Sequence, residues 1–250
     1  MPLQDLSLPA AWPVALGLPL GFGLLAFVLR WVRRSGLIAG VPLGVLVLRL
    51  GGVAGFGILA AFFLLGTLLT RLGYARKAAA GVAEEAGGRR GASHALANCG
   101  TGLLVLIGHA LLGGGSLPPV LWAAYVGAFA AAASDTSSSE IGQLYGKHPI
   151  SPRTLRPVPV GTEGAVSTEG TLGGIGAAAV LAGVGGAFGV LSLHGILAVT
   201  VGGFLGNFLE SLAGTWGRKL LPHGLLNFAN TVVGAIASAG LLAALTALLP

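Results

Sequence analysis

The amino-acid sequence predicts an all-α integral membrane protein, a polytopic helical bundle of about eight transmembrane helices with its functional site at the cytoplasmic edge. Hydrophobic residues make up 54% of the 250 residues and charged residues only 9%, whereas soluble domains carry about a quarter charged residues. Such a chain cannot cover a surface that faces water, so we expect lipid around most of it. Most of the charges are gathered in three polar segments, 71–95, 135–170 and 214–224, within a single transmembrane domain of residues 1–250.

The predicted helices follow from the apolar stretches, because a span needs about 20 apolar residues. We expect spans near 14–31, 36–51, 53–70, 96–113, 118–134, 171–189, 193–213 and 225–249. The second and third form one stretch that is too long for a single helix, and we expect a break near Arg49-Leu50-Gly51-Gly52. The 44 glycines favour a tight bundle, because small residues let helix backbones approach closely. No basic residue precedes the first apolar run, so we expect no cleavable signal peptide.

The basic residues divide the predicted loops into two sets. With eight spans, four loops fall on one side of the membrane, and they hold every Lys and Arg except Arg49: Arg30, Arg33, Arg34, Arg71, Arg76, Lys77, Arg89, Arg90, Lys147, Arg153, Arg156, Arg218 and Lys219. The positive-inside rule therefore predicts that these loops are cytoplasmic and that both termini lie on the opposite side. The same rule accounts for the net charge of +6, and we expect no nucleic-acid partner.

Seven of the eight acidic residues lie on the same predicted membrane face: Glu84, Glu85, Asp135, Glu140, Glu163, Glu169 and Glu210. Both signs of charge thus converge on one edge of an apolar protein. Carboxylates that hold Mg²⁺ beside Lys and Arg that hold phosphate would produce this arrangement. It predicts a site for a polyanion and a metal ion.

The first polar segment contains Gly87-Gly88-Arg89-Arg90-Gly91, in which two arginines lie between glycines. Arg suits bidentate phosphate contact, so Arg89 and Arg90 are candidate phosphate ligands. A solvated loop explains these two arginines equally well, and it is the better interpretation of Arg76 and Lys77. Asn98 is expected near a helix start, facing the bundle.

The second segment begins where we expect a span to end, at Asp135. Glu140 lies about 140° from Asp135 around a helix, so the two meet at one ligand only if the helix breaks or lies across the pocket. Ser137, Ser138 and Ser139 add hydroxyls. Further along, Glu163 and Glu169 precede an apolar helix whose N-terminus would favour a phosphate. The alternative role of these two acids is compensation of the helix dipole.

The stretch 206–235, which contains the third segment, places Asn207, Glu210 and Gly214 at i, i+3 and i+7 of one helix face, and Asn227 and Asn230 follow at i and i+3 of the next span. Polar residues stacked on one face inside an apolar bundle predict a shared wet pocket. Hydrogen bonding between helices explains the asparagines about as well but explains Glu210 poorly. The chain has no Gly-x-x-x-x-Gly-Lys-Ser/Thr loop, which excludes the soluble kinase folds that depend on it.

Four motifs in order resemble a known membrane family. "GVAEEAGGRRG", "DTSSSEIGQLYGK", "VPVGTEGAVSTEGTLGG" and "GNFLESLAGT" followed by "LLNFAN" are similar to the family once named domain of unknown function ninety-two, especially its phytyl-phosphate kinases. The likeness covers residues 70–235. It implies transfer of phosphate from a nucleoside triphosphate, with CTP the expected donor, to phytyl or another prenyl monophosphate. The product would be the diphosphate used in tocopherol and phylloquinone synthesis. More distantly, the motifs resemble dolichol kinases and CDP-diacylglycerol synthases.

Together, the patterns and the resemblance define a candidate site. The expected catalytic residues are Asp135, Glu140, Lys147, Glu163 and Glu169, and the expected Mg²⁺ ligands are Asp135, Glu140 and Glu210. The residues expected to bind substrate or nucleotide are Arg89, Arg90, Asn98, Ser138, Arg153, Arg156, Gly161, Thr162, Gly164, Ser167, Asn207, Glu210, Asn227 and Asn230.

Three other functions remain open from the sequence. A cytidylyltransferase would use the same CTP site and leave a CMP-linked lipid. A transporter or flippase for a phosphorylated lipid should show polar residues on both faces or repeats in two halves, and a structural membrane protein would not need clustered acids. The expected partners are CTP or another nucleoside triphosphate, a prenyl monophosphate and membrane lipids, and a homo-oligomer is compatible with the sequence.

Overall fold

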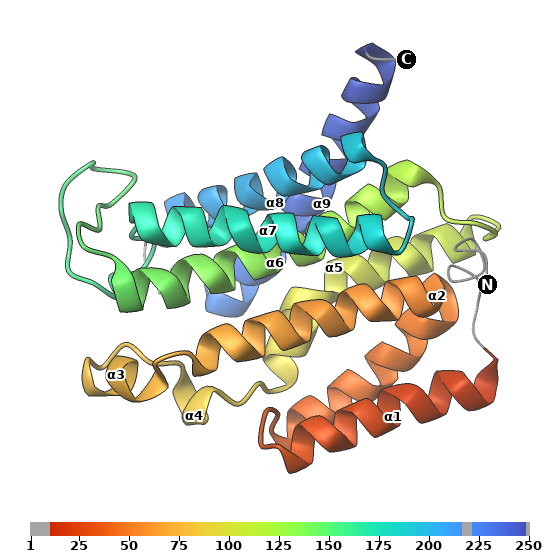
Figure 1. The fold of residues 1–250 in the computed structure, drawn as a ribbon, viewed down its shortest axis with the longest axis horizontal. Helices are drawn as coiled ribbons and strands as arrows, with labels where there is room; N and C mark the ends of the chain where they lie inside the picture. The colour runs from red at the N-terminus through yellow and green to blue at the C-terminus, as the bar shows by residue number, and fades with distance from the viewer. Residues whose placement is uncertain (1–10, 217–221, 249–250) are drawn as a thin grey trace.

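The computed structural model describes residues 11–216 and 222–248, and its regular elements are all helical (Figure 1). The predicted basic residues Arg218 and Lys219 lie outside the described residues. In the described ranges, β pairing is limited to isolated bridges, which confirms the all-α class. The helices are α1 (Trp12–Val28), α2 (Arg34–Arg71), α3 (Tyr74–Ala79), α4 (Glu85–Gly88), α5 (Ala92–Leu111), α6 (Pro119–Tyr145), α7 (Thr168–Ala187), α8 (Leu193–Gly214) and α9 (His223–Leu248).

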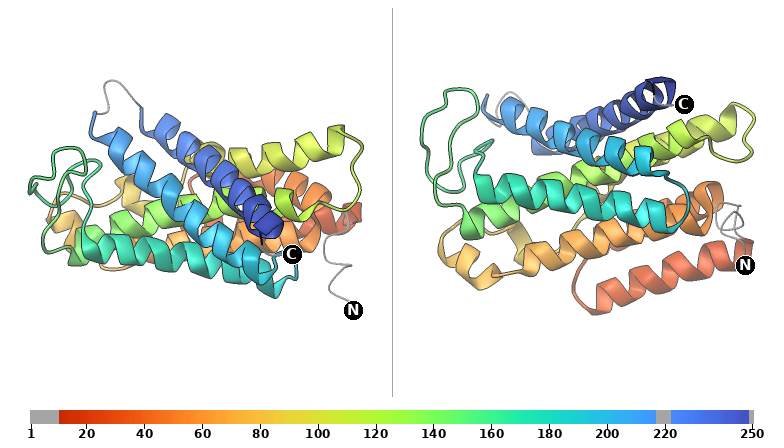
Figure 2. Two further views of the ribbon diagram at one scale, coloured as in Figure 1. Left: turned by 90° about the horizontal axis from the view of Figure 1, so that it is seen from above. Right: turned by 45° about the horizontal axis from the view of Figure 1, so that its top comes forward.

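By length and composition, five of the described helices could cross a membrane: α2, α5, α7, α8 and α9. Helix α1 is apolar but has only 17 residues. Helix α6 has 27 residues, but its second half carries the Ser, Asp and Glu side chains of the polar segment. The long helices lie side by side in one bundle (Figure 2). The structure therefore confirms a polytopic helical bundle, and the number of about eight spans stays a prediction.

Helix α2 is broken where its sequence is too long for one span. Gly52 has φ 63° and ψ −165°, a backbone conformation open essentially only to glycine. The two halves of α2 fold back on each other at this point (Figure 1). The predicted break near Arg49–Gly52 is thus confirmed, and α2 contributes two helical segments to the bundle.

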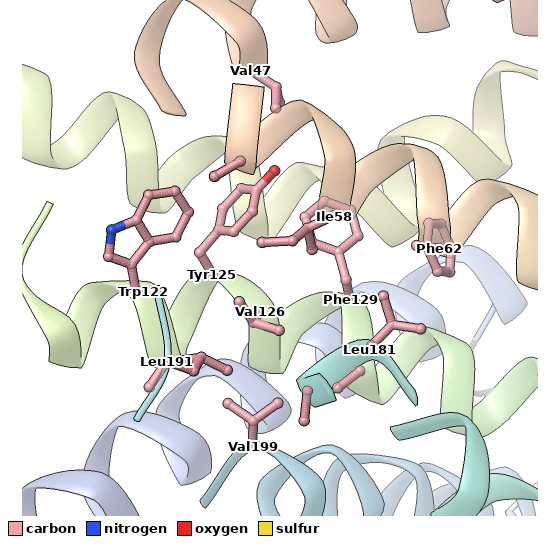
Figure 3. Close-up of a cluster of buried hydrophobic side chains, with 14 of the residues drawn as sticks. Val47, Ile58, Phe62, Trp122, Tyr125, Val126, Phe129, Leu181, Leu191 and Val199 are labelled. Carbon is pink, nitrogen blue, oxygen red and sulfur yellow. The ribbon is translucent and has the colours of Figure 1, made fainter. Parts of the chain in front are cut away.

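Helix α6 lies at the centre of the fold and contacts α2, α5, α7, α8 and α9. The apolar side chains of α6 are buried from Trp122 to Ala133, and the Tyr125 hydroxyl donates a hydrogen bond to the carbonyl of Gly55 in α2 at 2.7 Å. Trp122, Tyr125 and Phe129 form a row of rings against α2 (Figure 3). The core of the protein is therefore built around α6.

Helix α6 does not end at Asp135, where we expect a span to end, but continues without interruption to Tyr145. The end of the span at Asp135 stays a prediction. The polar residues stay helical because neighbouring helices bind their side chains: the Ser137 hydroxyl, for example, donates to the carbonyl of Gly173 in α7 at 2.9 Å. Asp135 and Glu140 therefore project from different faces of one continuous helix.

The polar connections gather at one end of the bundle. The α6–α7 connection and the α3–α4 region lie at the same end, whereas the α5–α6 and α7–α8 turns lie at the other (Figures 1 and 2). The turn between α1 and α2 lies at the same end as the α3–α4 region and is hydrogen-bonded to Arg90: Arg33 N donates to Arg90 O at 2.9 Å, and Arg90 N donates to Trp31 O at 3.1 Å. The described basic loops share one end, as expected from the sequence. Which side of the membrane this end faces stays a prediction.

Candidate functional site

A cluster of polar side chains lies between α6, α8 and α9, toward the end of the bundle that holds the polar connections. The Asn207 amide of α8 donates to two hydroxyls of α6, Ser138 Oγ at 2.7 Å and Ser134 Oγ at 3.1 Å. Helix α7 approaches closely because Gly174 has no side chain, and a Cβ there would lie 2.2 Å from Ser138 Oγ. Tight contact of backbones thus fixes the hydroxyls that hold Asn207.

Glu210 lies one turn after Asn207 on α8 and is held by α9. In the amide orientation that satisfies both neighbours, Asn227 donates to Glu210 Oε1 at 2.9 Å and to His223 O at 3.0 Å. One turn further along α9, the Asn230 amide donates to the carbonyl of Ala131 in α6 at 3.3 Å. The polar pattern predicted on α8 and α9 therefore does converge on one interior region.

Three oxygens in this region are buried and have no hydrogen-bond partner among the described residues: Glu210 Oε2, Asn207 Oδ1 and Asn230 Oδ1. A buried oxygen without a partner destabilises a protein by about 1–3 kcal/mol, more when it is charged. Three of them on facing helices are therefore unusual. All three oxygens are hydrogen-bond acceptors. A bound cation, or a hydrogen-bond donor on a ligand, would give them the partner that they lack.

Asp135 is half-buried on α6 and makes no ion pair or hydrogen bond with the described residues. Its carboxylate lies close enough to Glu84 and Glu140 to interact with them electrostatically, and Glu210 interacts in the same way with Asp135 and Glu163. Acidic side chains from several separate segments thus surround one region. This concentration of negative charge favours cation binding.

Glu140 forms a buried ion pair with Lys77 of α3. Lys77 is only 1% exposed, and its ammonium also donates to the carbonyl of Thr70 at 2.9 Å. The interpretation of Lys77 as a solvated loop residue is therefore wrong. The short helix α3 folds against α6 and thereby buries Lys77. The only hint of this in the sequence is weak: three alanines, which allow close packing, directly follow Lys77.

The two adjacent arginines have different surroundings. Arg89 is exposed, and its Nε donates to the carbonyl of Ala86. The Arg90 guanidinium points inward, with its carbon 5.4 Å from the centre of the Phe62 ring. It occupies space left by Gly66, where a Cβ would lie 2.2 Å from a guanidinium nitrogen. Of the two predicted phosphate ligands, only Arg90 faces the interior.

Beside Arg90, Glu84 and His94 link the α3–α4 connection to α5, with Oε1 and Nε2 3.1 Å apart. This hydrogen bond to His94 holds the pKa of Glu84 below its usual value, against the opposing effect of burial. Asn98, one turn after His94, is buried on α5. His94 was given no role from the sequence, because its spacing to other residues carries no signal.

The loop between α6 and α7 lies against two other segments. A Cβ on Gly161 would lie 2.4 Å from a Val82 methyl, and one on Gly164 would lie 2.4 Å from the carbonyl of Ser211 in α8. Thr162 closes the turn by donating to Pro159 O at 2.8 Å. The predicted turn at 161–164 therefore connects the end of α8 to the α3–α4 region, at the edge of the polar cluster.

The remaining predicted residues lie at this edge or outside it. Ser167 caps α7 by accepting a hydrogen bond from Gly170 N at 3.1 Å, and Glu169 lies in the first turn of that helix. Lys147, Arg153 and Arg156 are exposed in the α6–α7 loop. The structure thus brings together Asp135, Ser138, Glu140, Asn207, Glu210, Asn227, Asn230 and Arg90, but not Lys147, Arg89, Arg153 or Arg156.

The predicted metal ligands do not form a preassembled cage. Within the described residues, no three His, Cys, Asp or Glu side chains lie at distances that would hold a metal. Glu140 is engaged by Lys77. Asp135, Glu210 and the free amide oxygens of Asn207 and Asn230 are oxygen donors of the kind that Mg²⁺ prefers. These residues fit a hard cation that also keeps bonds to a phosphate or to water.

Comparison with known proteins places the chain among membrane proteins. The family model described as integral membrane protein DUF92 matches residues 17–221. The uncharacterized membrane protein sll0875 of Synechocystis sp. is 37% identical over 94% of this chain and 86% of its own length. Protein VTE6, chloroplastic, of Arabidopsis thaliana is 35% identical over 82% of this chain and 63% of its own length. The uncharacterized membrane protein MJ0933 of Methanocaldococcus jannaschii is 34% identical over 83% of this chain and 84% of its own length. No solved structure matches the chain.

Proposed function

This chain belongs to the integral membrane family DUF92, and from that premise we propose that it is a prenyl-phosphate kinase. It transfers a phosphate from a nucleoside triphosphate to phytyl monophosphate or a related prenyl monophosphate, and CTP is the expected donor. The diphosphate formed serves tocopherol or phylloquinone synthesis. The observation that carries the proposal is the set of partnerless acceptor oxygens and acidic side chains inside an apolar bundle, with Arg90 and Lys77 beside them.

The proposed chemistry needs positioning and charge neutralisation more than proton transfer. An oxygen of the acceptor phosphate attacks the γ-phosphorus, and the bond from that phosphorus to the β,γ-bridging oxygen breaks, so that the nucleoside diphosphate leaves. The acceptor is mostly dianionic near neutral pH, since the second pKa of a phosphate monoester is about 6. It therefore needs little help from a general base, and the main barrier is bringing two polyanions together.

The interior residues can be assigned parts in this scheme. Asp135 and Glu210 would hold Mg²⁺, with the amide oxygens of Asn207 and Asn230 beside them. When bound, the cation supplies charge neutralisation for the phosphates. The buried ion pair between Lys77 and Glu140 fixes α3 against α6 at the border of the site. Ser134 and Ser138 orient the Asn207 amide.

The exposed basic residues of the α6–α7 loop suit the nucleotide. Lys147, Arg153 and Arg156 lie on the loop whose 161–164 turn packs against the end of α8. Arg and Lys on such a loop would meet the triphosphate as it arrives from water. We place this entrance at the cytoplasmic edge, in keeping with the positive-inside rule.

The proposal is tested with purified protein in detergent, Mg²⁺, phytyl monophosphate and γ-labelled CTP, with γ-labelled ATP and GTP in parallel. Label in a lipid diphosphate supports the kinase and identifies its donor. Label in released pyrophosphate, together with a CMP-linked lipid, shows a cytidylyltransferase instead. Absence of turnover with phytyl, geranylgeranyl and farnesyl phosphate contradicts the proposal and favours the transport function.

A further inference from the structure

A second interior space lies apart from the polar cluster. Helix α1, both halves of α2 and the start of α5 border a cavity of about 100 Å³ that is partly open to the exterior. Its walls are almost entirely hydrocarbon, with Phe22, Leu37, Leu43, Phe56 and Phe63 among them. The lining includes two ionisable side chains besides the Cys99 thiol, Arg90 and His94.

One glycine leaves this space open. A Cβ on Gly40 would meet nothing within 4 Å, whereas Gly23, Gly36 and Gly44, which also line the cavity, let neighbouring atoms approach closely. Protein interiors are normally packed as densely as organic crystals, so an apolar space of this kind loses contacts that its walls would otherwise make. A hydrocarbon chain would restore those contacts.

The polar end of the cavity is formed by Arg90. Its backbone is fixed by hydrogen bonds with Trp31 and Arg33, and its guanidinium lies between the Phe62 ring and Gly66. Within the described ranges the guanidinium has no ion pair and no hydrogen bond, whereas His94 is already engaged by Glu84. The guanidinium's acidic neighbours Glu84 and Glu140 act on it only at longer range, so an anion in direct contact would offset the cost of burying this charge. Arg is also the residue best suited to a phosphate.

Arg90 also connects the cavity to the polar cluster. Its charge interacts with Glu84 and Glu140, and Glu140 in turn interacts with Asp135. An amphiphile with its chain in the cavity and its anionic group at Arg90 would therefore present that group toward the carboxylates of α6.

We propose that the cavity between α1, α2 and α5 binds the hydrocarbon tail of a long-chain alkyl or isoprenoid phosphate monoester, with Arg90 binding its phosphate. This inference rests on the proposed function, for which it supplies the acceptor subsite. It also divides the molecule: α1, α2 and α5 select the lipid, whereas α6, α8 and α9 carry the chemistry.

The first test fills the cavity. Gly40→Phe places a ring in the open space, and Gly108→Phe is the matched control, because Gly108 is half-buried on α5, has nothing within 4 Å of its Cβ and does not line the cavity. KM and kcat are measured for phytyl phosphate and for the five-carbon dimethylallyl phosphate. In Gly40→Phe we expect KM for phytyl phosphate to rise about tenfold or more, with the five-carbon substrate and the control unchanged. An equal effect on both substrates, or on neither, overturns the proposal.

The second test measures binding on the unmodified protein and needs no turnover. A phytyl phosphate analogue with a diazirine on its tail is photocrosslinked, and the labelled peptides are identified by mass spectrometry. Label in α1, α2 and the start of α5 that unlabelled phytyl phosphate removes supports the proposal, even if the kinase assay fails. Label confined to α7–α9 overturns it. Label that phosphatidylglycerol removes and phytyl phosphate does not identifies a site for bulk lipid, which also overturns it.

The third test concerns the phosphate. Arg90→Gln should weaken binding of phytyl phosphate about tenfold and leave binding of phytol, which lacks the phosphate, unchanged. Arg90→Lys should restore part of the affinity, because the charge remains. Equal weakening of both ligands by Arg90→Gln would mean that Arg90 only maintains the fold, and this result overturns its assignment to the phosphate.

Discussion

Gly234 of α9 and Gly40 of α2, in the two halves of this bundle, have opposite surroundings. Between α6, α8 and α9 glycine brings backbones together: a Cβ on Gly234 would lie 2.4 Å from the Cβ of Ala131 and 2.7 Å from the carbonyl of Gly127. Between α1, α2 and α5, Gly36 and Gly44 also allow close contacts, but Gly40 faces the cavity and a Cβ there would touch nothing. The close-packed half fixes polar side chains to within hydrogen-bonding distance of one another, and the open half encloses an apolar cavity. A glycine in the sequence therefore does not by itself show whether two helices pack closely or leave a cavity; the atoms around it decide this.

The largest effect is expected at the buried ion pair at the edge of the close-packed half. Lys77→Met leaves Glu140 charged and buried without its partner, which should lower the free energy of unfolding by about 3–5 kcal/mol. Thermal unfolding in detergent measures this. Arg76→Met is the control, because Arg76 precedes Lys77 on α3 but its side chain is exposed, so the same substitution there should leave stability unchanged. Equal melting temperatures for the two variants would contradict burial of Lys77.

The next effect concerns catalysis in the same half. Asp135→Asn keeps the size of the side chain and removes the charge proposed to bind the cation, so kcat should fall about 10²–10³-fold while the melting temperature stays near that of the parent. Ser139→Ala, at an exposed position on the same helix, is the control and should keep full turnover. Parental activity in Asp135→Asn would remove Asp135 from the catalytic set.

A smaller effect should separate the two halves directly. Gly234→Ala forces α9 away from α6 and should destabilise the protein by about 1–3 kcal/mol, as overpacking does in other cores. The melting temperature reports this loss. Because Asn227, Asn230 and Gly234 share α9, turnover should fall as well. A Gly234→Ala variant with the parent's stability would show that the two backbones are not in contact.

The smallest effect is expected at the matching substitution in the open half. Gly40→Ala adds a methyl group that meets no atom, and it should raise the free energy of unfolding by about 0.4–1 kcal/mol, because alanine restricts the unfolded chain. The same melting experiment compares it with Gly234→Ala. Destabilisation of similar size in both variants would mean that the cavity is closed in solution.

The fold was largely predictable because it depends on hydropathy. The break in α2 followed from length alone, since one helix could not use all of residues 36–70, and Gly52 supplies the conformation that the break needs. The end of α6 was not predictable in this way. A polar run after an apolar one normally indicates the end of a span, but here α7 and α8 cover it, and the helix continues from Asp135 to Tyr145.

The part of the candidate site whose residues recur on one helix face was predictable from the sequence. Asn207 and Glu210, at i and i+3, do meet Ser138 and Asn227 across the helix interfaces. Lys77 was missed because α3 has only six residues, too few for periodicity to show which face is buried. Arg89 and Arg90 were indistinguishable in sequence, but left-handed backbone at Ala86 and Gly87 precedes them, and the chain then sends one side chain outward and the other inward.

The break at Gly52 has a mechanical consequence. Leu37 and Leu43 precede it and Phe56 and Phe63 follow it, so two walls of the apolar cavity belong to one continuous stretch of chain joined at a single residue. The torsion angles of Gly52 set the angle between the two halves of α2. A substitution at Gly52 would therefore change the width of the cavity without replacing any lining residue. Selectivity for chain length, or for branched against linear tails, can then be adjusted from a point that the lipid never touches.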